Sequence, residues 1–232
     1  GYPLMLKSCT GGYDGKGVQF IRKEKDLDKA FEAPSLVEDP IDFDKELSVI
    51  VARNESGEMK TFPLVECEFS PELNLVEFLF SPAAVSEAIE ESAEQLAKKV
   101  VKSLDMVGIL AVELFLTKDG RLLVNEVAPR PHNSGHHTIE CNITSQFEQH
   151  FRSILDLPLG STKMRTPGVM VNLLGHPEYT GPAYYKGLEK VMTWPGTYVH
   201  LYGKEETKPN RKMGHATITG TTIEEAKELA RK

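Results

Sequence analysis

The sequence lacks long apolar segments, an excess of positive charge and a dense set of cysteines. No apolar run approaches the ~18 residues that a membrane-spanning helix needs, so we expect no association with a membrane. The formal net charge is −7, which argues against a nucleic-acid partner. The three cysteines are widely spaced and form neither a disulfide framework nor a metal-binding knuckle. This cysteine usage suits a reducing compartment, and we predict a cytoplasmic protein.

What remains is the composition of an ordinary globular protein. The 232 residues are 40% hydrophobic and 26% charged, enough for one or two domains with a sizeable core. Gly1-Tyr2-Pro3 leads directly into an apolar segment that has the pattern of a buried strand. We therefore expect the sequence to open within a domain.

The segment 108–127 has the pattern of a β-hairpin. Two apolar runs flank Lys118-Asp119-Gly120-Arg121, and Asp-Gly between such runs predicts a two-residue type I′ turn. In that register Lys118 faces Arg121, and Glu113 faces Glu126.

Two facing carboxylates repel each other, and burial increases the repulsion. A shared proton or a bound cation offsets this cost. Mg²⁺ commonly binds one or two protein carboxylates together with substrate phosphates. We therefore predict a magnesium site at Glu113 and Glu126, the alternative being a slipped register that leaves one glutamate in solvent.

The loop after this hairpin is rich in hydrogen-bond donors. Pro131 and Gly135 argue against a helix, so His132 and His136 are not a helical zinc pair. Zinc is a poor alternative because no cysteine lies nearby. We predict a loop that binds a small anion beside a metal–phosphate centre. For each histidine alone the alternative is a solvated loop residue, but this alternative is weak for the group beside two facing glutamates. Its polar residues are Arg130, His132, Asn133, Ser134, His136 and His137.

Residues 10–17 contain four glycines in eight residues, between predicted strands at 4–7 and 18–21. Backbone N–H groups of such a loop can approach phosphate oxygens closely. The sequence does not match a P-loop, because Ser or Thr does not follow Gly-Lys and no helix follows. We predict a flap that closes over a nucleotide, with a plain glycine-rich hairpin as the alternative.

The remaining patterns predict a mixed α+β fold. Helices are expected at 23–31, 82–104, 144–155 and after a capping box at 222–225. Strands are expected at 35–37, 46–51, 59–66, 75–80, 169–174, 197–201 and 215–219. A linker at 158–167 predicts two domains, residues 1–160 and a small β-rich domain at 161–232 that ends in a helix.

Three strings carry a resemblance to a known family. They are Gly11-Gly12-Tyr13-Asp14-Gly15-Lys16-Gly17, Arg130-Pro131-His132-Asn133-Ser134-Gly135-His136, and the tail at 202–215. Over essentially the whole chain the sequence resembles the ATP-grasp 5-(carboxyamino)imidazole ribonucleotide synthases of purine biosynthesis. The strings separate this family from biotin carboxylase and from the formate-using glycinamide ribonucleotide transformylase. The resemblance implies an ATP-grasp domain at 1–160, incomplete at its N-terminus, because members carry a nucleotide-fold domain and more of the ATP-grasp domain ahead of Lys7.

The resemblance also implies a reaction. ATP, with Mg²⁺, phosphorylates bicarbonate to carboxyphosphate, and the amine of 5-aminoimidazole ribonucleotide takes up the carboxylate. Two alternatives stay open: another ATP-grasp carboxylate–amine ligase, or a truncated ATP-binding module without full activity. The basic pair Lys204 and Arg211 favours a phosphorylated amine. A homodimer is expected from the family.

By the same resemblance, each motif residue has an expected role. ATP binding falls to Lys7, Gly12, Gly15, Glu38, Glu46 and Asn125, and Mg²⁺ binding to Glu113 and Glu126. The catalytic residues are Lys16, Arg130, His132 and Asn133, with Arg130 and Asn133 near bicarbonate. Substrate binding falls to Tyr13, Asp14, Lys204, Arg211 and Lys212, of which Lys204 and Arg211 clamp the ribonucleotide phosphate.

Overall fold

The computed structural model describes residues 1–11, 17–69 and 76–232. Most of these residues belong to strands or to the loops between them. The strands are β1 Leu4–Ser8, β2 Val18–Ile21, β3 Ser35–Glu38, β4 Phe43–Arg53, β5 Met59–Thr61, β6 Val65–Phe69, β7 Val76–Ser81, β8 Gly108–Thr117, β9 Leu122–Ala128, β10 Gly168–Leu174, β11 Gly181–Pro182, β12 Thr197–Leu201, β13 Glu206–Thr207 and β14 Lys212–Thr219.

The helices are fewer and mostly short. The α-helices are α1 Glu87–Ser103, α2 Thr138–Cys141, α3 Gln146–Ile154, α4 Leu188–Val191 and α5 Ile223–Ala230. Two 3-10 turns, η1 Glu24–Lys29 and η2 Asn133–Gly135, complete the set for the described part of the chain. The mixed α+β class predicted from the sequence is confirmed.

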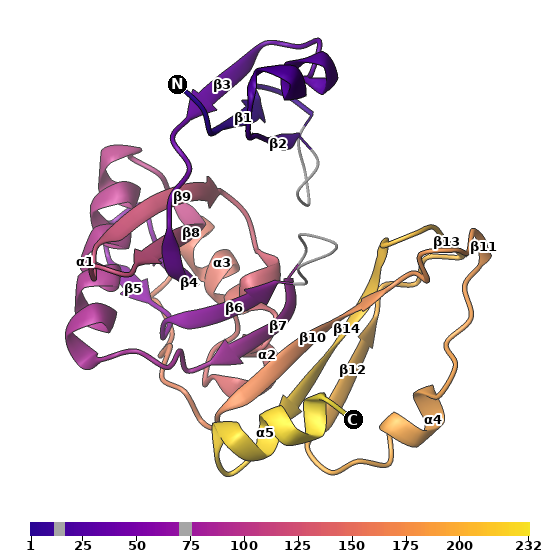
Figure 1. The fold of residues 1–232 in the computed structure, drawn as a ribbon. Helices are drawn as coiled ribbons and strands as arrows, with labels where there is room; N and C mark the ends of the chain where they lie inside the picture. The colour runs from indigo at the N-terminus through magenta and orange to yellow at the C-terminus, as the bar shows by residue number, and fades with distance from the viewer. Residues whose placement is uncertain (12–16, 70–75) are drawn as a thin grey trace.

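An antiparallel sheet forms the centre of the molecule (Figure 1), with strand order β12-β14-β10-β7-β6-β4-β8-β9 and β5 beside β4. A three-stranded sheet, β2-β1-β3, precedes it in the chain, and the pair β11-β13 extends from the C-terminal strands. The central sheet therefore joins strands from both sides of the predicted domain boundary, through the pairing of β10 with β7. The boundary at residue 160 stays a prediction.

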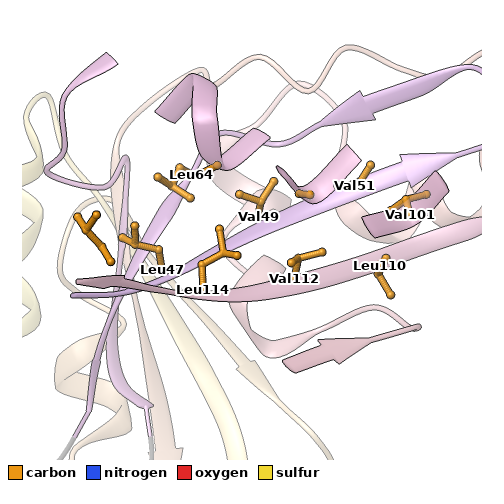
Figure 2. Packing of buried hydrophobic residues seen from close by; sticks show 11 residues of the cluster. Leu47, Val49, Val51, Leu64, Val101, Leu110, Val112 and Leu114 are labelled. Atoms are coloured by element: carbon orange, nitrogen blue, oxygen red, sulfur yellow. The ribbon is translucent and has the colours of Figure 1, made fainter. Parts of the chain in front are cut away.

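One face of this sheet is apolar. Leu47, Val49 and Val51 of β4 point toward α1 together with alternate residues of β8 (Figure 2). Helix α1 presents Ala93 and Ala97 at a spacing of four, which places them on one stripe. At the other end of the sheet, α5 covers the same face in a second apolar cluster. Burial of each large aliphatic side chain contributes roughly 1.5–3 kcal/mol, so this face holds the fold together.

The opposite face is different. Successive residues of a strand point to opposite faces, so the residues between those core positions lie on the other side. Elements η2, α2 and α3 pack on that side against β4, β8 and β14. Reading across the strands, Ser48 faces Glu113, Glu113 faces Glu126, and Asn172 faces His215. These polar residues therefore share one face of the sheet, which we call the polar face, and they lie there beside the buried apolar residues Ile50 and Ala111.

The β8–β9 hairpin confirms one prediction and corrects another. Glu113 does face Glu126. The two-residue turn is wrong: Thr117 pairs with Arg121, and Gly120 has a φ of 81°. This is a three-residue loop that ends in a left-handed glycine. Next to this loop the pairing is therefore one residue away from the predicted register. A bulge in β9 adds one residue between the partners of Leu114 and Glu113, and from Glu113 onward the pairing is the predicted one.

Other elements follow the sequence with local corrections. The strand predicted at 59–66 is broken at Pro63 into β5 and β6, because proline has no N–H for the ladder. The helix predicted at 23–31 is the 3-10 turn η1. The capping box is confirmed: the Thr222 hydroxyl accepts from Glu225 N–H at 3.2 Å, and Glu225 Oε2 accepts from Thr222 N–H at 3.3 Å. None of the described helices has the length and apolarity to cross a membrane.

Candidate active site

Three carboxylates meet at one corner of the polar face. Glu113 of β8 and Glu126 of β9 lie opposite each other, and Glu46 comes from β4. Burial raises the pKa of Glu113 to about 7, with further increases from the charges of Glu126 and Glu46. Burial and then the charge of Glu126 raise the pKa of Glu46 to about 7. We call these three residues the carboxylate corner. Their repulsion persists until a cation or a proton neutralises it.

Lys7 reaches this corner from the small sheet. Its Nζ lies 2.8 Å from Glu38 Oε2 and 2.9 Å from Asn125 Oδ1. Asn125 is the extra residue of the bulge in β9, so the bulge presents its side chain to the lysine. The structure thus brings together three residues predicted from the sequence to bind ATP.

A cavity of about 390 Å³ opens between the small sheet and this corner. This volume is typical of small-molecule sites, which combine apolar walls with a few convergent polar groups. Its polar lining includes Lys7, Glu38, Glu46, Glu113, Asn125 and Glu126, and its apolar lining includes Met5, Val18, Phe20 and Phe115.

The loop after β9 lies beside the corner. His132 Nε2 is 3.3 Å from Glu113 Oε1. Asn133 and Asn172 exchange two side-chain amide hydrogen bonds of 2.8 and 3.1 Å, which tie the loop to β10. Arg130 is exposed, and its Nη1 donates to the Pro131 carbonyl. Of the three catalytic residues predicted here, His132 contacts the corner directly.

Buried Gln146 fixes this loop. Its Oε1 accepts from His132 N–H at 2.9 Å, and its Nε2 donates to the His132 carbonyl at 2.8 Å. Gly135 fits because a Cβ there would lie 2.2 Å from Ile50 Cδ1 and 2.4 Å from Gln146 Oε1. The backbone of the loop is therefore positioned without any ligand.

The basic residues of the tail gather near the start of β14. Lys204 Nζ donates to the Lys212 carbonyl at 2.5 Å, and Arg211 Nη1 donates to the Glu206 carbonyl at 2.7 Å. The charge of Lys212 opposes the increase in the pKa of Glu113. Lys212 therefore acts electrostatically on the carboxylate corner, although it is distant in sequence.

A second group of titratable residues was not predicted from the sequence. His136 stacks on His215 with 4.6 Å between ring centroids, and His215 stacks on His200 at 4.5 Å. We call these three residues the histidine stack. His200 Nε2 lies 2.8 Å from Glu140 Oε1, and Tyr202 Oη lies 3.0 Å from His215 Nδ1. Burial lowers the pKa of His136 to about 4 and that of His215 to about 3, so both are neutral at pH 7.

The structure shows the surroundings of two loop histidines. The ring of His136 packs against β14, and its Nδ1 lies 3.1 Å from Gln146 Nε2. His137 is buried, at 1% exposure, and is not a solvated donor. His136 and His215 each end one of the strings quoted above, but nothing in the sequence indicates that the two strings meet.

Five predicted site residues lie outside the described residues: Gly12, Tyr13, Asp14, Gly15 and Lys16. The predicted flap rests on the same residues.

The donor set at the corner fits the predicted Mg²⁺. Among the described residues, no group of three or more His, Cys, Asp or Glu side chains is arranged to hold a metal. Glu113 and Glu126 supply two hard oxygen ligands whose mutual repulsion a dication relieves. This set suits a cation shared with substrate phosphates better than one held by protein alone.

Comparison with known proteins supplies the family. Residues 1–147 match the ATP-grasp domain model, and residues 168–229 match the phosphoribosylaminoimidazole carboxylase C-terminal domain. The chain is 45% identical over 223 residues to the N5-carboxyaminoimidazole ribonucleotide synthase of Bacillus subtilis, covering 93% of this chain and 56% of that protein. The corresponding protein of Synechococcus elongatus is 42% identical, with 94% and 55% covered. The chain thus spans about half the length of these relatives.

Solved structures agree. The N5-carboxyaminoimidazole ribonucleotide synthetase of Thermotoga maritima superposes with a TM-score of 0.91 at 46% identity, covering 100% of this chain and 61% of that one. The synthase of Aspergillus clavatus, in complex with ADP and 5-aminoimidazole ribonucleotide, gives a TM-score of 0.89 at 37% identity, with 99% and 61% covered. With a carboxylate corner beside a nucleotide-sized cavity and a family match over residues 1–147, the chain belongs to the ATP-grasp family.

Proposed function

We propose that this chain takes part in the ATP-dependent carboxylation of 5-aminoimidazole ribonucleotide in purine biosynthesis. Bicarbonate oxygen attacks the γ-phosphorus of ATP and displaces ADP, which gives carboxyphosphate. Carboxyphosphate then releases phosphate, and the exocyclic amine nitrogen bonds to the carboxyl carbon and loses a proton. The products are 5-carboxyaminoimidazole ribonucleotide, ADP and phosphate. A relative with ADP and 5-aminoimidazole ribonucleotide bound supports this assignment.

One observation carries the proposal. Lys212, which belongs to the basic tail, lies close enough to the carboxylate corner for its charge to act on Glu113. A phosphoryl transfer needs charge neutralisation and positioning more than covalent chemistry by the protein. A phosphorylated second substrate needs a separate basic site. The carboxylate corner and the basic residues around Lys212 are our candidates for these two sites.

The nucleotide half of the site has defined roles. Lys7 holds the phosphates, as its contact with Asn125 beside the corner supports. Glu38 lies at the adenine hinge and Glu46 at the ribose, both in the wall of the cavity. Glu113 and Glu126 hold Mg²⁺, which when bound neutralises charge on the transferring phosphoryl group.

The acceptor half uses the loop and the tail. Arg130 and Asn133 bind bicarbonate, and His132 orients the reacting groups. Lys204, Arg211 and Lys212 bind the ribonucleotide phosphate. Arginine suits this role because its planar guanidinium makes paired hydrogen bonds to phosphate. Lys16, Tyr13 and Asp14 complete the acceptor site by their match to the family motif.

We also propose a cytoplasmic homodimer with a domain boundary near residue 160. Exposed apolar side chains on and after α3, among them Phe151 and Leu155 at 62% exposure each, support a subunit contact.

The test is phosphate release from ATP by the purified chain, measured with and without bicarbonate and 5-aminoimidazole ribonucleotide. Release that needs both supports the proposal. Release with bicarbonate and a different amine indicates another carboxylate–amine ligase, and Mg²⁺–ADP binding without turnover indicates a binding module. Glu113→Gln should abolish release, whereas Glu91→Gln, an exposed position on α1, should not.

A further inference from the structure

Three contacts link four side chains in series at the carboxylate corner. His132 Nε2 lies 3.3 Å from Glu113 Oε1, and His132 Nδ1 lies 2.9 Å from Ser134 Oγ. Ser134 Oγ lies 2.8 Å from Ser48 Oγ. Ser48 and Glu113, the two ends of this series of contacts, face each other on β4 and β8, and we call the four residues the ring. The sheet register thus fixes two members and the loop supplies the other two.

The protons of this ring can be placed. His132 is the N-cap of η2, and its Nδ1 accepts from Ser134 N–H at 3.3 Å. A backbone N–H can only donate, so Nδ1 must present its lone pair. The Ser134 hydroxyl, 2.9 Å from the same nitrogen, then donates to it as well, and the Ser48 hydroxyl donates to Ser134. With Nδ1 as an acceptor, the one proton that a neutral imidazole carries is on Nε2, which points at Glu113.

We propose that Ser134, held by Ser48, is a positioning residue that keeps His132 as the Nε2–H tautomer. His132 is then a hydrogen-bond donor at the carboxylate corner and not a general base. Both serines are buried, at 3% and 1% exposure, so water does not compete for these bonds.

The proton on His132 Nε2 limits what this side chain can do chemically. A nitrogen that already carries a proton cannot accept one from the substrate amine. It can orient a carboxylate, and hydrogen bonds to metal-binding carboxylates tune the metal site. The tautomer is a property of the chain itself, whereas its catalytic consequence rests on the proposed function.

The first test measures the tautomer without turnover. The chain is labelled with ¹⁵N-histidine, and the His132 nitrogens are assigned by their loss in His132→Gln. We expect Nδ1 to resonate as an unprotonated nitrogen and Nε2 as a protonated one. Protonated Nδ1 in the unmodified chain overturns the proposal.

Variants locate the cause. Ser134→Ala removes one donor to Nδ1 and should raise the share of the Nδ1–H tautomer roughly 2- to 10-fold, the equivalent of one net hydrogen bond. Ser134→Thr keeps the hydroxyl and should restore the original ratio. Ser153→Ala is the matched control, because the Ser153 hydroxyl is buried but donates to the Gln149 carbonyl outside the ring. An unchanged ratio in Ser134→Ala contradicts the role of Ser134.

The second test compares two substitutions at His132 under turnover. Gln offers an N–H donor in place of Nε2–H but is no base, and Leu offers neither. A donor role predicts that His132→Gln retains much more activity than His132→Leu. A general-base role predicts a similar loss in both, on the order of 100-fold or more. If the unmodified chain shows no turnover, the proposed function fails while the tautomer measurement still decides this inference.

Discussion

The carboxylate corner and the histidine stack lie on the same face of one sheet, yet burial acts on them in opposite directions. At the corner it raises the pKa of Glu46 and Glu113, and in the stack it lowers the pKa of His136 and His215. Both groups are pushed toward their neutral forms.

The histidine stack and the carboxylate corner differ in the contacts that surround their titratable side chains. The rings of the stack cover one another, and Glu140 and Tyr202 supply its polar contacts. The corner opens on a cavity, and the repulsion between its carboxylates remains until a cation or a proton neutralises it. We infer that the stack is structural and that the corner is the reactive region. The predictions below separate the two.

Loss of a corner carboxylate should have the largest effect. Glu113→Gln and Glu126→Gln each remove one ligand of the proposed cation, and we expect the affinity for Mg²⁺–ADP to fall about 100-fold or more. Isothermal titration calorimetry measures this change. Affinity within a few-fold of the original in both variants would show that the corner does not hold the metal.

The same variants test the stability of the corner without ligand. The raised pKa means that folded Glu113 holds its proton to about pH 7, above the ordinary value of 4.5. Ionisation therefore destabilises the folded protein as the pH rises from about 4.5 through 7. Glu113→Gln should remove part of this loss of stability, so at pH 8 the variant should unfold at an equal or higher urea concentration than the original chain.

The stack should respond to acid in the opposite sense. In the unfolded chain His215 takes up a proton near pH 6.5, but in the folded chain only near pH 3. Stability should therefore fall as the pH drops below about 6.5. His215→Phe keeps a flat ring without a titrating nitrogen, and should reduce the loss between pH 7 and 4 by on the order of 2 kcal/mol. Urea unfolding at the two pH values measures it, and parallel curves for both proteins would argue against a neutral stack.

The sequence predicts more of the carboxylate corner than of the histidine stack, because part of the corner lies within one hairpin. The facing of Glu113 and Glu126 is a local contact within one hairpin, and an Asp-Gly turn placed between two apolar runs was enough to predict it. The loop length was mistaken, because Asp119-Gly120 fits a two-residue turn as well as the observed three-residue loop. The bulge at Asn125 cancelled the error, and its contact with distant Lys7 is not visible in the hairpin sequence.

The stack is assembled by contacts far apart in the chain. His200 meets His215 through the pairing of β12 with β14, and His136 reaches them from the loop after β9. No local pattern fixes the order of strands in a sheet, so periodicity cannot place these rings together. The same holds for Ser48 and Ser134.

Asn172 connects the two regions, and its pairing with Asn133 should have an intermediate effect. Removing Asn133 leaves the nearly buried Asn172 Oδ1 without its donor, at a cost of about 1–3 kcal/mol, while Asn172 Nδ2 still donates to the Val76 carbonyl. Asn133→Ala, Asn172→Ala and the double variant form a cycle in which the second change should cost much less than the first. Additive losses in urea unfolding would show that the two amides act independently.

The smallest effect should come from Tyr202. Tyr202→Phe removes only the hydroxyl that is hydrogen-bonded to His215 Nδ1, so we expect a loss of about 1 kcal/mol in urea unfolding at pH 7. Tyr198→Phe on β12 is the control, because Tyr198 is 47% exposed and a surface change of this kind typically stays within about 0.5 kcal/mol. Calorimetry with Mg²⁺–ADP should give the same affinity for both variants, since neither residue lines the cavity. If Tyr202→Phe weakens nucleotide binding as strongly as Glu113→Gln, the stack is part of the nucleotide site and the division between the two regions is wrong.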